Sequence, residues 1–260
     1  MHLIDMNVKR PVGLALSGGA ARGFAHLGVL QALDELNLRP EYLSGTSAGA
    51  IAAAFYADGY KPHEILKLLC SYKLKDYIRP GWMGPGLMKT TGFYRILYEN
   101  LHAGKIENLP LPVWICITNL NSGKAEYHNT GNLARKVLAS CSIPVFFKPV
   151  TINNQLMVDG GVCDNLPVKP IKDKAAFTIA VNVNPILPKK IKPGIRGIAE
   201  RVFHLSINSR LKEMIIQPDI LIEPDEIASL GYFNLGNAEK LFSAGYKAVF
   251  NTILNDYAPS

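Results

Sequence analysis

Residues 12–17 read Val-Gly-Leu-Ala-Leu-Ser, and the turn Gly-Gly-Ala-Ala-Arg-Gly follows directly at 18–23. A short apolar run that ends in glycines predicts a strand buried on both faces of a sheet. Apolar side chains at helical spacing then predict a helix over about 22–37. A buried strand, a glycine-rich turn and an amphipathic helix together make the first unit of an α/β fold.

Strands and helices alternate from that unit to the end of the sequence. This alternation predicts a three-layer α/β/α sandwich with a largely parallel central sheet. No internal repeat or long linker divides the sequence, so residues 1–260 are expected to form a single domain. Further strands are predicted at 42–45, 112–120, 124–129, 155–158, 175–183 and 219–223, and further helices at 47–57, 63–72, 133–142, 195–216 and 238–255.

The composition indicates a folded chain with a sizeable core. Apolar residues make up 48% of the 260 residues and charged residues 19%, which excludes an intrinsically disordered chain. The longest apolar run, 48–57, is ten residues long and falls short of the ~20 that span a bilayer. Residues 9–21 imitate a secretory signal, but Pro11 opens the apolar segment and Gly18 breaks it. We therefore expect a cytoplasmic protein that is not integral to the membrane.

The charge balance favours contacts with anionic surfaces. Twenty-eight Lys and Arg against 21 Asp and Glu give a net charge of +7. Lipid headgroups fit this charge, so peripheral membrane contact is one expectation, whereas no nucleic-acid partner is expected. The densest basic stretch, 188–196, fits either a solvated loop or an anionic contact. The cysteines lack the close pairs that bind zinc, so reduced, mostly buried thiols and no metal site are expected.

A second glycine-flanked motif, Gly45-Thr46-Ser47-Ala48-Gly49, stands between a predicted short strand and an Ala-rich helix. This is the setting of a nucleophile elbow, in which a strained turn lifts a serine hydroxyl above the sheet at a helix N-terminus. The flanking glycines leave room for that turn. Ser47 is therefore the candidate nucleophile, and an ordinary serine at a helix start is the alternative.

The turn at 17–23 presents consecutive backbone N–H groups at the start of a helix, and such a nest binds an anion. A Walker A phosphate loop does not fit, because it needs Lys and then Ser or Thr where Phe24 and Ala25 stand. A dinucleotide fingerprint also fails, since Ala20 replaces a glycine and no acidic residue ends the second strand. In an acyl hydrolase the same N–H groups would form the oxyanion hole for a reaction at Ser47.

Two residues are candidates for the base that activates Ser47. His204 follows Asp159 in the sequence, so the three residues have the chain order of an α/β-hydrolase triad. His204 falls in the middle of a predicted helix, however, where a packed histidine is far commoner than a catalytic one. Asp159 ends a strand before two glycines. It could act without a histidine only in a desolvated setting or with a hydrogen bond to Ser47, because an ordinary aspartate is a weak base.

The stretch 77–98 does not follow the alternation of strands and helices. It is rich in glycine and proline, yet it also carries methionine and aromatic side chains. It is expected to be a long irregular connection, either a lid over a site for an acyl chain or a loop that caps the core.

Together these motifs resemble those of the patatin-like phospholipases, which are acyl hydrolases with a catalytic Ser-Asp dyad and no catalytic histidine. The resemblance covers about residues 10–254, and its flanking motifs stand at 25–30, 139–144 and 164–168. It implies the patatin-like variant of the hydrolase architecture, with Ser47 as the nucleophile and Asp159 as the base. The residues that it implies build or support the oxyanion hole are Gly18, Gly19, Ala20 and Arg22.

The resemblance implies a serine acyl hydrolase that cleaves carboxylic esters of lipids, of phospholipase A, lysophospholipase or esterase type. The expected partner is a lipid or small ester substrate, no metal or organic cofactor is expected, and the oligomeric state is left open. Ala20 departs from the family pattern, which has a third glycine there. A positive φ at this position would cost alanine roughly 1 kcal/mol and weaken the hole. A catalytically weak or silent lipid-binding protein of the same fold is therefore the alternative.

Overall fold

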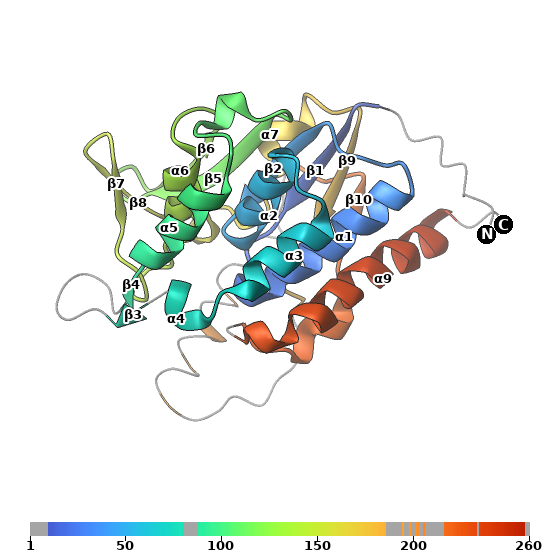
Figure 1. Ribbon diagram of the computed structural model, residues 1–260. Helices are drawn as coiled ribbons and strands as arrows, with labels where there is room; N and C mark the ends of the chain where they lie inside the picture. The colour runs from blue at the N-terminus through green and yellow to red at the C-terminus, as the bar shows by residue number, and fades with distance from the viewer. Residues whose placement is uncertain are drawn as a thin grey trace.

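The computed structural model describes residues 10–77, 79–80, 88–185, 194, 198, 201–202, 205, 216–232 and 234–257. Within these residues the strands form one eight-stranded sheet and one two-stranded ribbon, with helices packed on the sheet (Figure 1). The ribbon pairs β3 (Arg79–Pro80) with β4 (Met88–Lys89). The strands of the sheet are β1 (Val12–Leu16), β2 (Tyr42–Thr46), β5 (Val113–Asn119), β6 (Lys124–His128), β7 (Val150–Ile152), β8 (Gln155–Asp159), β9 (Phe177–Val181) and β10 (Ile220–Ile222).

The sheet is parallel in one part and antiparallel in the other. Its strand order is β10-β9-β1-β2-β5-β8-β7, and β6 also pairs with β5. The strands from β10 to β5 are parallel to one another, whereas β6 and β8 run antiparallel to β5, and β7 runs antiparallel to β8. The predicted α/β/α sandwich is confirmed. Its sheet is mixed: it is parallel from β10 to β5, and the antiparallel pairing begins at β5.

The register brings the ends of three strands to one edge of the sheet. Leu16 pairs with Gly45, so the glycine-rich turn after β1 and the elbow after β2 start side by side. The next strand, β5, pairs with β2 and also with β8, in the latter case through Ile117 and Asp159. The sheet therefore carries the elbow and Asp159 to the same edge, with β5 between them.

Helices cover the two faces of the sheet unequally. They are α1 (Phe24–Glu35), α2 (Ala48–Ala57), α3 (Pro62–Ser71), α4 (Leu74–Tyr77), α5 (Thr91–Asn100), α6 (Leu133–Ser140), α7 (Lys169–Lys172) and α9 (Ala238–Tyr257). Leu14 and Leu16 face the main core, whereas Ala15 between them packs in a smaller cluster with Leu166 and Ile171. On the main face α1 lies side by side with α3 and α9 (Figure 1). The short α7 carries Ile171 and packs on the opposite face.

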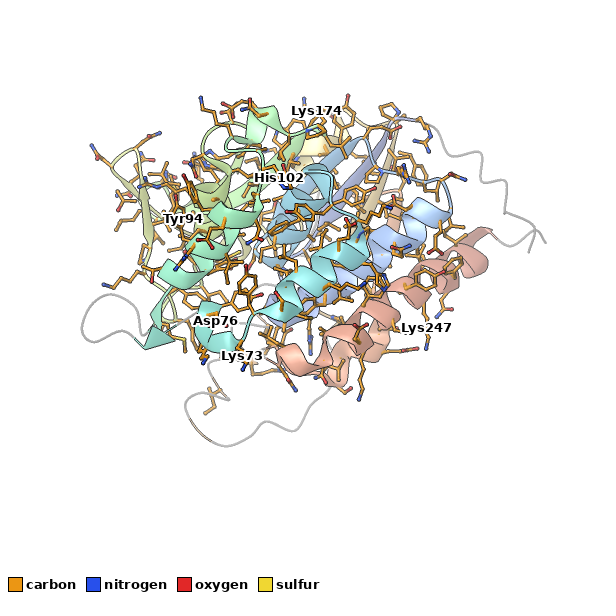
Figure 2. All side chains as sticks on the ribbon, in the orientation of Figure 1. Lys73, Asp76, Tyr94, His102, Lys174 and Lys247 are labelled. Carbon is orange, nitrogen blue, oxygen red and sulfur yellow. The ribbon has the colours of Figure 1, made fainter. Side chains whose placement is uncertain are left out.

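The stretch 77–98 is not irregular throughout, and that part of its prediction is wrong. Part of the stretch lies outside the described residues, but its end belongs to α5. Phe93 and Leu97 are buried one turn apart, and the rings of Tyr94 and Tyr98 stack with centroids 6.0 Å apart. Figure 2 shows Tyr94 on this helix. The sequence pattern did not predict this helix, because only a few apolar residues follow helical spacing here and they come directly after a run of glycine and proline.

The other predicted helices and strands are confirmed within a few residues. The exceptions are the helix at 195–216 and the basic stretch at 188–196, which fall almost entirely outside the described residues. All four cysteines are free thiols, as expected, but only Cys116 is fully buried and Cys70 is exposed. None of the helices in the described ranges is both long enough and apolar enough to cross a bilayer.

Candidate active site

Ser47 stands at a strained turn between β2 and α2. Its backbone has φ 51° and ψ −117°, which is unfavourable for a residue with a side chain and typical of a nucleophile elbow. The turn requires glycine at 45 and 49, because a side chain at either position would clash with the backbone. A Cβ on Gly49 would lie 2.2 Å from the carbonyl oxygen of Leu16, and one on Gly45 would lie 2.5 Å from the backbone of Gly49.

The glycine-rich turn after β1 lies directly beside the elbow. A Cβ on Gly18 would stand 3.2 Å from the Cβ of Ser47. The N–H of Gly18 donates to the carbonyl of Asn165 at 3.1 Å, so it is not a free donor as the sequence had suggested. The N–H groups of Gly19 and Ala20 have no protein acceptor among the described residues. These two groups are therefore available to an anion next to Ser47.

Ala20 does adopt the positive φ that a glycine would accept, at 48°. We expect Ala20→Gly to raise the free energy of unfolding by about 0.5 kcal/mol, because relief of the strained φ exceeds the entropy lost by a more flexible unfolded chain. Urea denaturation of both proteins measures this difference. Ala21→Gly is the control, since Ala21 has no positive φ and the same change there should destabilise the fold. Equal destabilisation by both changes would contradict the prediction.

Arg22 is buried and anchors the glycine-rich turn to residues 228–232. Its guanidinium donates to the carbonyls of Ala228 at 2.9 Å and Leu230 at 2.8 Å. It also donates to the hydroxyl of Tyr232 at 2.9 Å and lies 4.0 Å from the centre of that ring. The N–H of Ala21 adds a bond to the Tyr232 carbonyl at 2.8 Å. Arg22 therefore fixes the position of the glycine-rich turn relative to residues 228–232.

Asp159 ends β8 and is 2% exposed. Its carboxylate accepts a hydrogen bond from the N–H of Gly161 at 2.8 Å and interacts with the side chain of Ser47. Burial raises the pKa of Asp159 to about 7, because a charged carboxylate is poorly solvated there, and the two hydrogen bonds only partly oppose this shift. The structure thus brings the predicted serine and aspartate together, in the desolvated setting that a carboxylate base requires.

A third segment, at the end of α6, fixes the backbone of both residues. The N–H of Ser47 donates to the hydroxyl of Ser140 at 2.8 Å, and that hydroxyl donates to the carbonyl of Cys116 at 2.6 Å. The N–H of Asp159 donates to the carbonyl of Ser142 at 2.9 Å. In the sequence, residues 139–144 stand out only as a flanking motif without an evident role. Its signal was the serine pair just before a proline.

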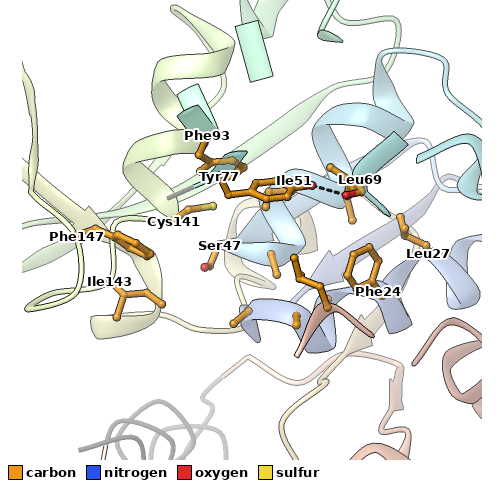
Figure 3. A pocket seen from close by; sticks show the side chains of 16 residues that line it. Phe24, Leu27, Ser47, Ile51, Leu69, Tyr77, Phe93, Cys141, Ile143 and Phe147 are labelled. Carbon is orange, nitrogen blue, oxygen red and sulfur yellow. Dashed lines mark hydrogen bonds between the residues drawn. The ribbon is translucent and has the colours of Figure 1, made fainter. Parts of the chain in front are cut away.

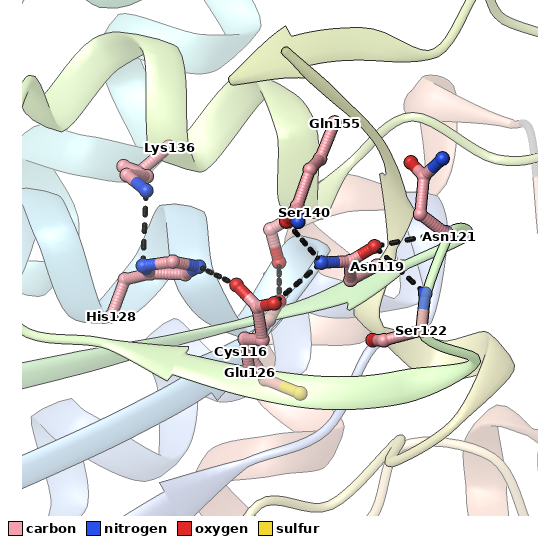
Figure 4. Close-up of polar contacts among 9 residues, drawn as sticks. All are labelled: Cys116, Asn119, Asn121, Ser122, Glu126, His128, Lys136, Ser140 and Gln155. Atoms are coloured by element: carbon pink, nitrogen blue, oxygen red, sulfur yellow. Dashed lines mark hydrogen bonds and ion pairs between the residues drawn. The ribbon is translucent and has the colours of Figure 1, made fainter. Parts of the chain in front are cut away.

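A half-buried polar cluster ties α6 to β6 (Figure 4). The ammonium of Lys136, one turn before Ser140, lies 2.9 Å from Nδ1 of His128. Nε2 of His128 lies 3.0 Å from the carboxylate of Glu126, which also accepts a bond from Asn119 at 2.6 Å. Burial lowers the pKa of Lys136, and burial together with that ammonium lowers the pKa of His128. The cluster links the helix that carries Ser140 to the sheet.

We expect Ser140→Ala to lower the free energy of unfolding by about 1–3 kcal/mol, because it leaves the buried N–H of Ser47 without an acceptor. It should also lower kcat, since the turn that carries Ser47 loses its support. The control is Ser142→Ala, which removes an equally buried hydroxyl whose partner, the carbonyl of Leu138, belongs to a helix. Urea denaturation and ester turnover compare the two, and equal losses would contradict the role given to Ser140.

An apolar pocket of about 180 Å³ opens at Ser47 (Figure 3). Aromatic and aliphatic side chains from α1, α2, α5 and the loop after α6 form its walls, and the Ser47 hydroxyl is among the few polar groups that reach it. Cys141 also lines the pocket. Burial raises the pKa of its thiol well above the usual value, so the thiol stays neutral. The lining residues include Phe24, Leu27, Ile51, Leu69, Tyr77, Phe93, Ile143, Phe147 and Leu235.

The described residues do not test the histidine alternative. His204 lies outside them. His26 is fully buried, donates from Nε2 to the carbonyl of Ser17 at 2.7 Å, and has a pKa lowered to about 4 by burial, so it stays neutral. No group of three or more His, Cys, Asp or Glu side chains in the described ranges is arranged to hold a metal ion.

The family model for the patatin-like phospholipases matches residues 14–171, which include the glycine-rich turn, the elbow and Asp159. The chain belongs to the patatin-like phospholipase family. The match ends before residues 228–232, so the anchor of Arg22 involves a segment beyond the patatin-like match. The patatin-like resemblance drawn from the sequence is thereby confirmed.

Similar proteins agree with the patatin-like assignment. The chain is 28% identical to "Lysophospholipase nte1" of Emericella nidulans over 91% of its own length and 18% of that protein. It is 32% identical to an NTE family protein of Mycobacterium bovis over 66% of its length and 49% of that protein. Its fold is similar to VipD from Legionella pneumophila, with a TM-score of 0.63 at 14% identity over 95% of this chain and 67% of VipD. The chain thus spans less than a fifth of the fungal relative.

Proposed function

We propose that this chain is a serine acyl hydrolase that cleaves carboxylic ester bonds of lipids. The observation that carries the proposal is the hydroxyl of Ser47 against the buried carboxylate of Asp159, beside two N–H groups and an apolar pocket. Membership of the patatin-like phospholipase family supports the same reaction. The raised pKa of Asp159 supports a base that works near neutral pH.

The mechanism proceeds through an acyl enzyme. Asp159 accepts the proton of Ser47 as the serine oxygen attacks the ester carbonyl, and the N–H groups of Gly19 and Ala20 bind the resulting oxyanion. Gly18, which has no side chain, leaves room for that oxygen beside Ser47. The protonated Asp159 gives its proton to the leaving alcohol. Asp159 then takes a proton from a water molecule as the water oxygen attacks the acyl carbon. The bond between the acyl carbon and the Ser47 oxygen breaks, Asp159 returns the proton to that oxygen, and the carboxylic acid leaves.

The pocket supports a substrate with an acyl chain. Its walls are apolar, so a hydrocarbon chain gains free energy by leaving water there, while a polar headgroup would remain outside. The lysophospholipase named in the relatives supports a lysophospholipid as the first substrate to test. Because such lipids reside in or near bilayers, we also propose peripheral contact with a membrane.

A fluorophosphonate probe and three esters test the proposal. We expect the probe to label Ser47, as located by mass spectrometry, and the chain to hydrolyse lysophosphatidylcholine, phosphatidylcholine and p-nitrophenyl butyrate. His204→Ala should keep this turnover if Asp159 acts without a histidine. Labelling of another residue, or loss of turnover with His204→Ala, would refute the dyad.

The strained φ of Ala20 favours a second candidate, a lipid-binding protein of the same fold with little or no turnover. Such a protein would bind a fluorescent fatty acid in the pocket but would react with the probe no faster than free serine. Turnover of any of the three esters above the uncatalysed rate would exclude this candidate.

A further inference from the structure

Residues 143–147 form one wall of the pocket and expose one side chain on the outside. Ile143 and Phe147 line the cavity, where they lie on the same side of Ser47 (Figure 3). Val145, between them, is 72% exposed, the largest exposure among the large apolar side chains of the described residues. The loop therefore runs from the acyl site to the molecular surface within two residues.

The backbone of Val145 is strained. Its φ is 72°, in the left-handed region that β-branched residues rarely occupy. The turn between β7 and β8 meets the same requirement with Asn153 and Asn154, a residue type that tolerates positive φ. An exposed valine also contributes little hydrophobic stabilisation to the folded state. The stability of the fold therefore does not explain a valine at this position.

Two backbone hydrogen bonds hold the loop in this conformation. The N–H of Phe147 donates to the carbonyl of Ile143 at 2.9 Å, and the N–H of Met88 in β4 donates to the carbonyl of Phe146 at 2.9 Å. These bonds keep the loop that exposes Val145 rigid. The loop would therefore lose little conformational entropy if Val145 were buried against a partner. Strain that the surroundings impose in this way is found at functional sites.

We infer that Val145 and Lys148 dock this chain onto an anionic lipid surface, so that the pocket receives an acyl chain from the membrane. Lys148 is exposed three residues after Val145 and supplies positive charge next to the apolar side chain. The net charge of +7 also attracts the whole chain to a negatively charged membrane surface at long range. The inference rests on the proposed function, because it gives the direction from which the substrate enters.

Vesicle flotation of variants in a Ser47→Ala background tests docking without any chemistry. The vesicles contain equal parts of phosphatidylcholine and phosphatidylserine, with pure phosphatidylcholine as the uncharged comparison. Val145→Thr keeps the branched shape and the strain but adds a hydroxyl, and it should weaken binding about five- to tenfold. Lys148→Gln should weaken binding about fivefold at low salt on the anionic vesicles only.

A second variant separates docking from stability. Val145→Asn should raise the midpoint of thermal unfolding by about 2 °C, because asparagine accepts positive φ, and yet weaken vesicle binding as Val145→Thr does. The matched control is Leu221→Thr. Leu221 is 44% exposed and pairs with Ala180, whose side chain belongs to the opposite face of the sheet from the pocket. This control should bind vesicles like the parent protein.

The outcomes separate this inference from the proposed function. If the chain floats with vesicles through Val145 but hydrolyses no ester, the proposed function fails and docking stands. If Val145→Thr binds within about twofold of the parent, or if Leu221→Thr is equally impaired, docking through this loop is overturned. A change in sedimentation coefficient with Val145→Thr in the absence of lipid would assign the surface to a second copy of the chain and would also overturn it.

Discussion

Replacement of Ser47 by alanine is expected to reduce ester hydrolysis by about 10⁴-fold or more, because no other group can take over the attack on the carbonyl. The change should leave the fold intact. The strained φ of 51° is no worse for alanine than for serine, and the substitution removes a single oxygen atom from a buried position. Initial rates with p-nitrophenyl butyrate and lysophosphatidylcholine measure the loss.

The control for Ser47→Ala is Ser142→Ala, which removes a buried hydroxyl that is bonded to a helix carbonyl. It should retain most of the turnover, and both variants should unfold at similar urea concentrations. Turnover in Ser47→Ala above about one per cent of the parent rate would show that another nucleophile attacks the ester.

Asp159→Asn is expected to lower kcat by about 10³- to 10⁴-fold, because an amide cannot accept the proton of Ser47. In the parent protein the same carboxyl sets the pH dependence. Burial raises its pKa to about 7, and only the deprotonated form is a base. We therefore expect kcat/KM to fall about tenfold for each pH unit below that pKa and to level off above it. Rates from pH 5 to 9 measure this profile.

The same substitution is expected to stabilise the fold above neutral pH. Because burial raises the pKa of Asp159 from 3.8 to about 7, the folded chain holds a proton that the unfolded chain releases. The stability that this proton provides is complete below about pH 4 and is lost as the pH rises through about 7. The amide of the variant does not titrate, so the stability of the variant relative to the parent should grow over this range by at most about 4 kcal/mol.

Urea denaturation of the parent and of Asp159→Asn at pH 5 and pH 8 tests this linkage. The exposed Asp173 offers the control, and Asp173→Asn should leave both the pH–rate profile and the pH dependence of stability unchanged. If the stability of Asp159→Asn relative to the parent is the same at both pH values, the raised pKa is wrong. If the variant keeps its turnover, Asp159 is not the base.

Local patterns predicted the elements that carry the site. The apolar run before Gly18 predicted β1, and the Ala-rich segment after Ser47 predicted α2, because burial and helical spacing leave a signal within a few residues. The same patterns failed in two places. They missed α5, whose apolar period is short, and they placed the N–H of Gly18 among free donors although it bonds to Asn165.

The supports of the site left no local signal. Ser140 accepts a bond from the N–H of Ser47 across 93 positions of the chain, and Arg22 reaches Leu230 across 208. A serine near the end of a helix or an arginine in a turn has many ordinary roles, so its partner appears only when the chain is folded. The exposure and strain of Val145 belong to the same class, since neither follows from its neighbours in sequence.

By itself, the sequence determined which side chains are available for chemistry: a serine between glycines, an aspartate before two glycines and a row of N–H groups after a strand. Only the tertiary structure decided that they meet, through the pairing of β1, β2, β5 and β8 at one edge of the sheet. It also decided the proton affinity of Asp159, because a pKa depends on how much water the surrounding elements exclude. Residue identity sets what a group can do, and burial sets the pH at which it does it.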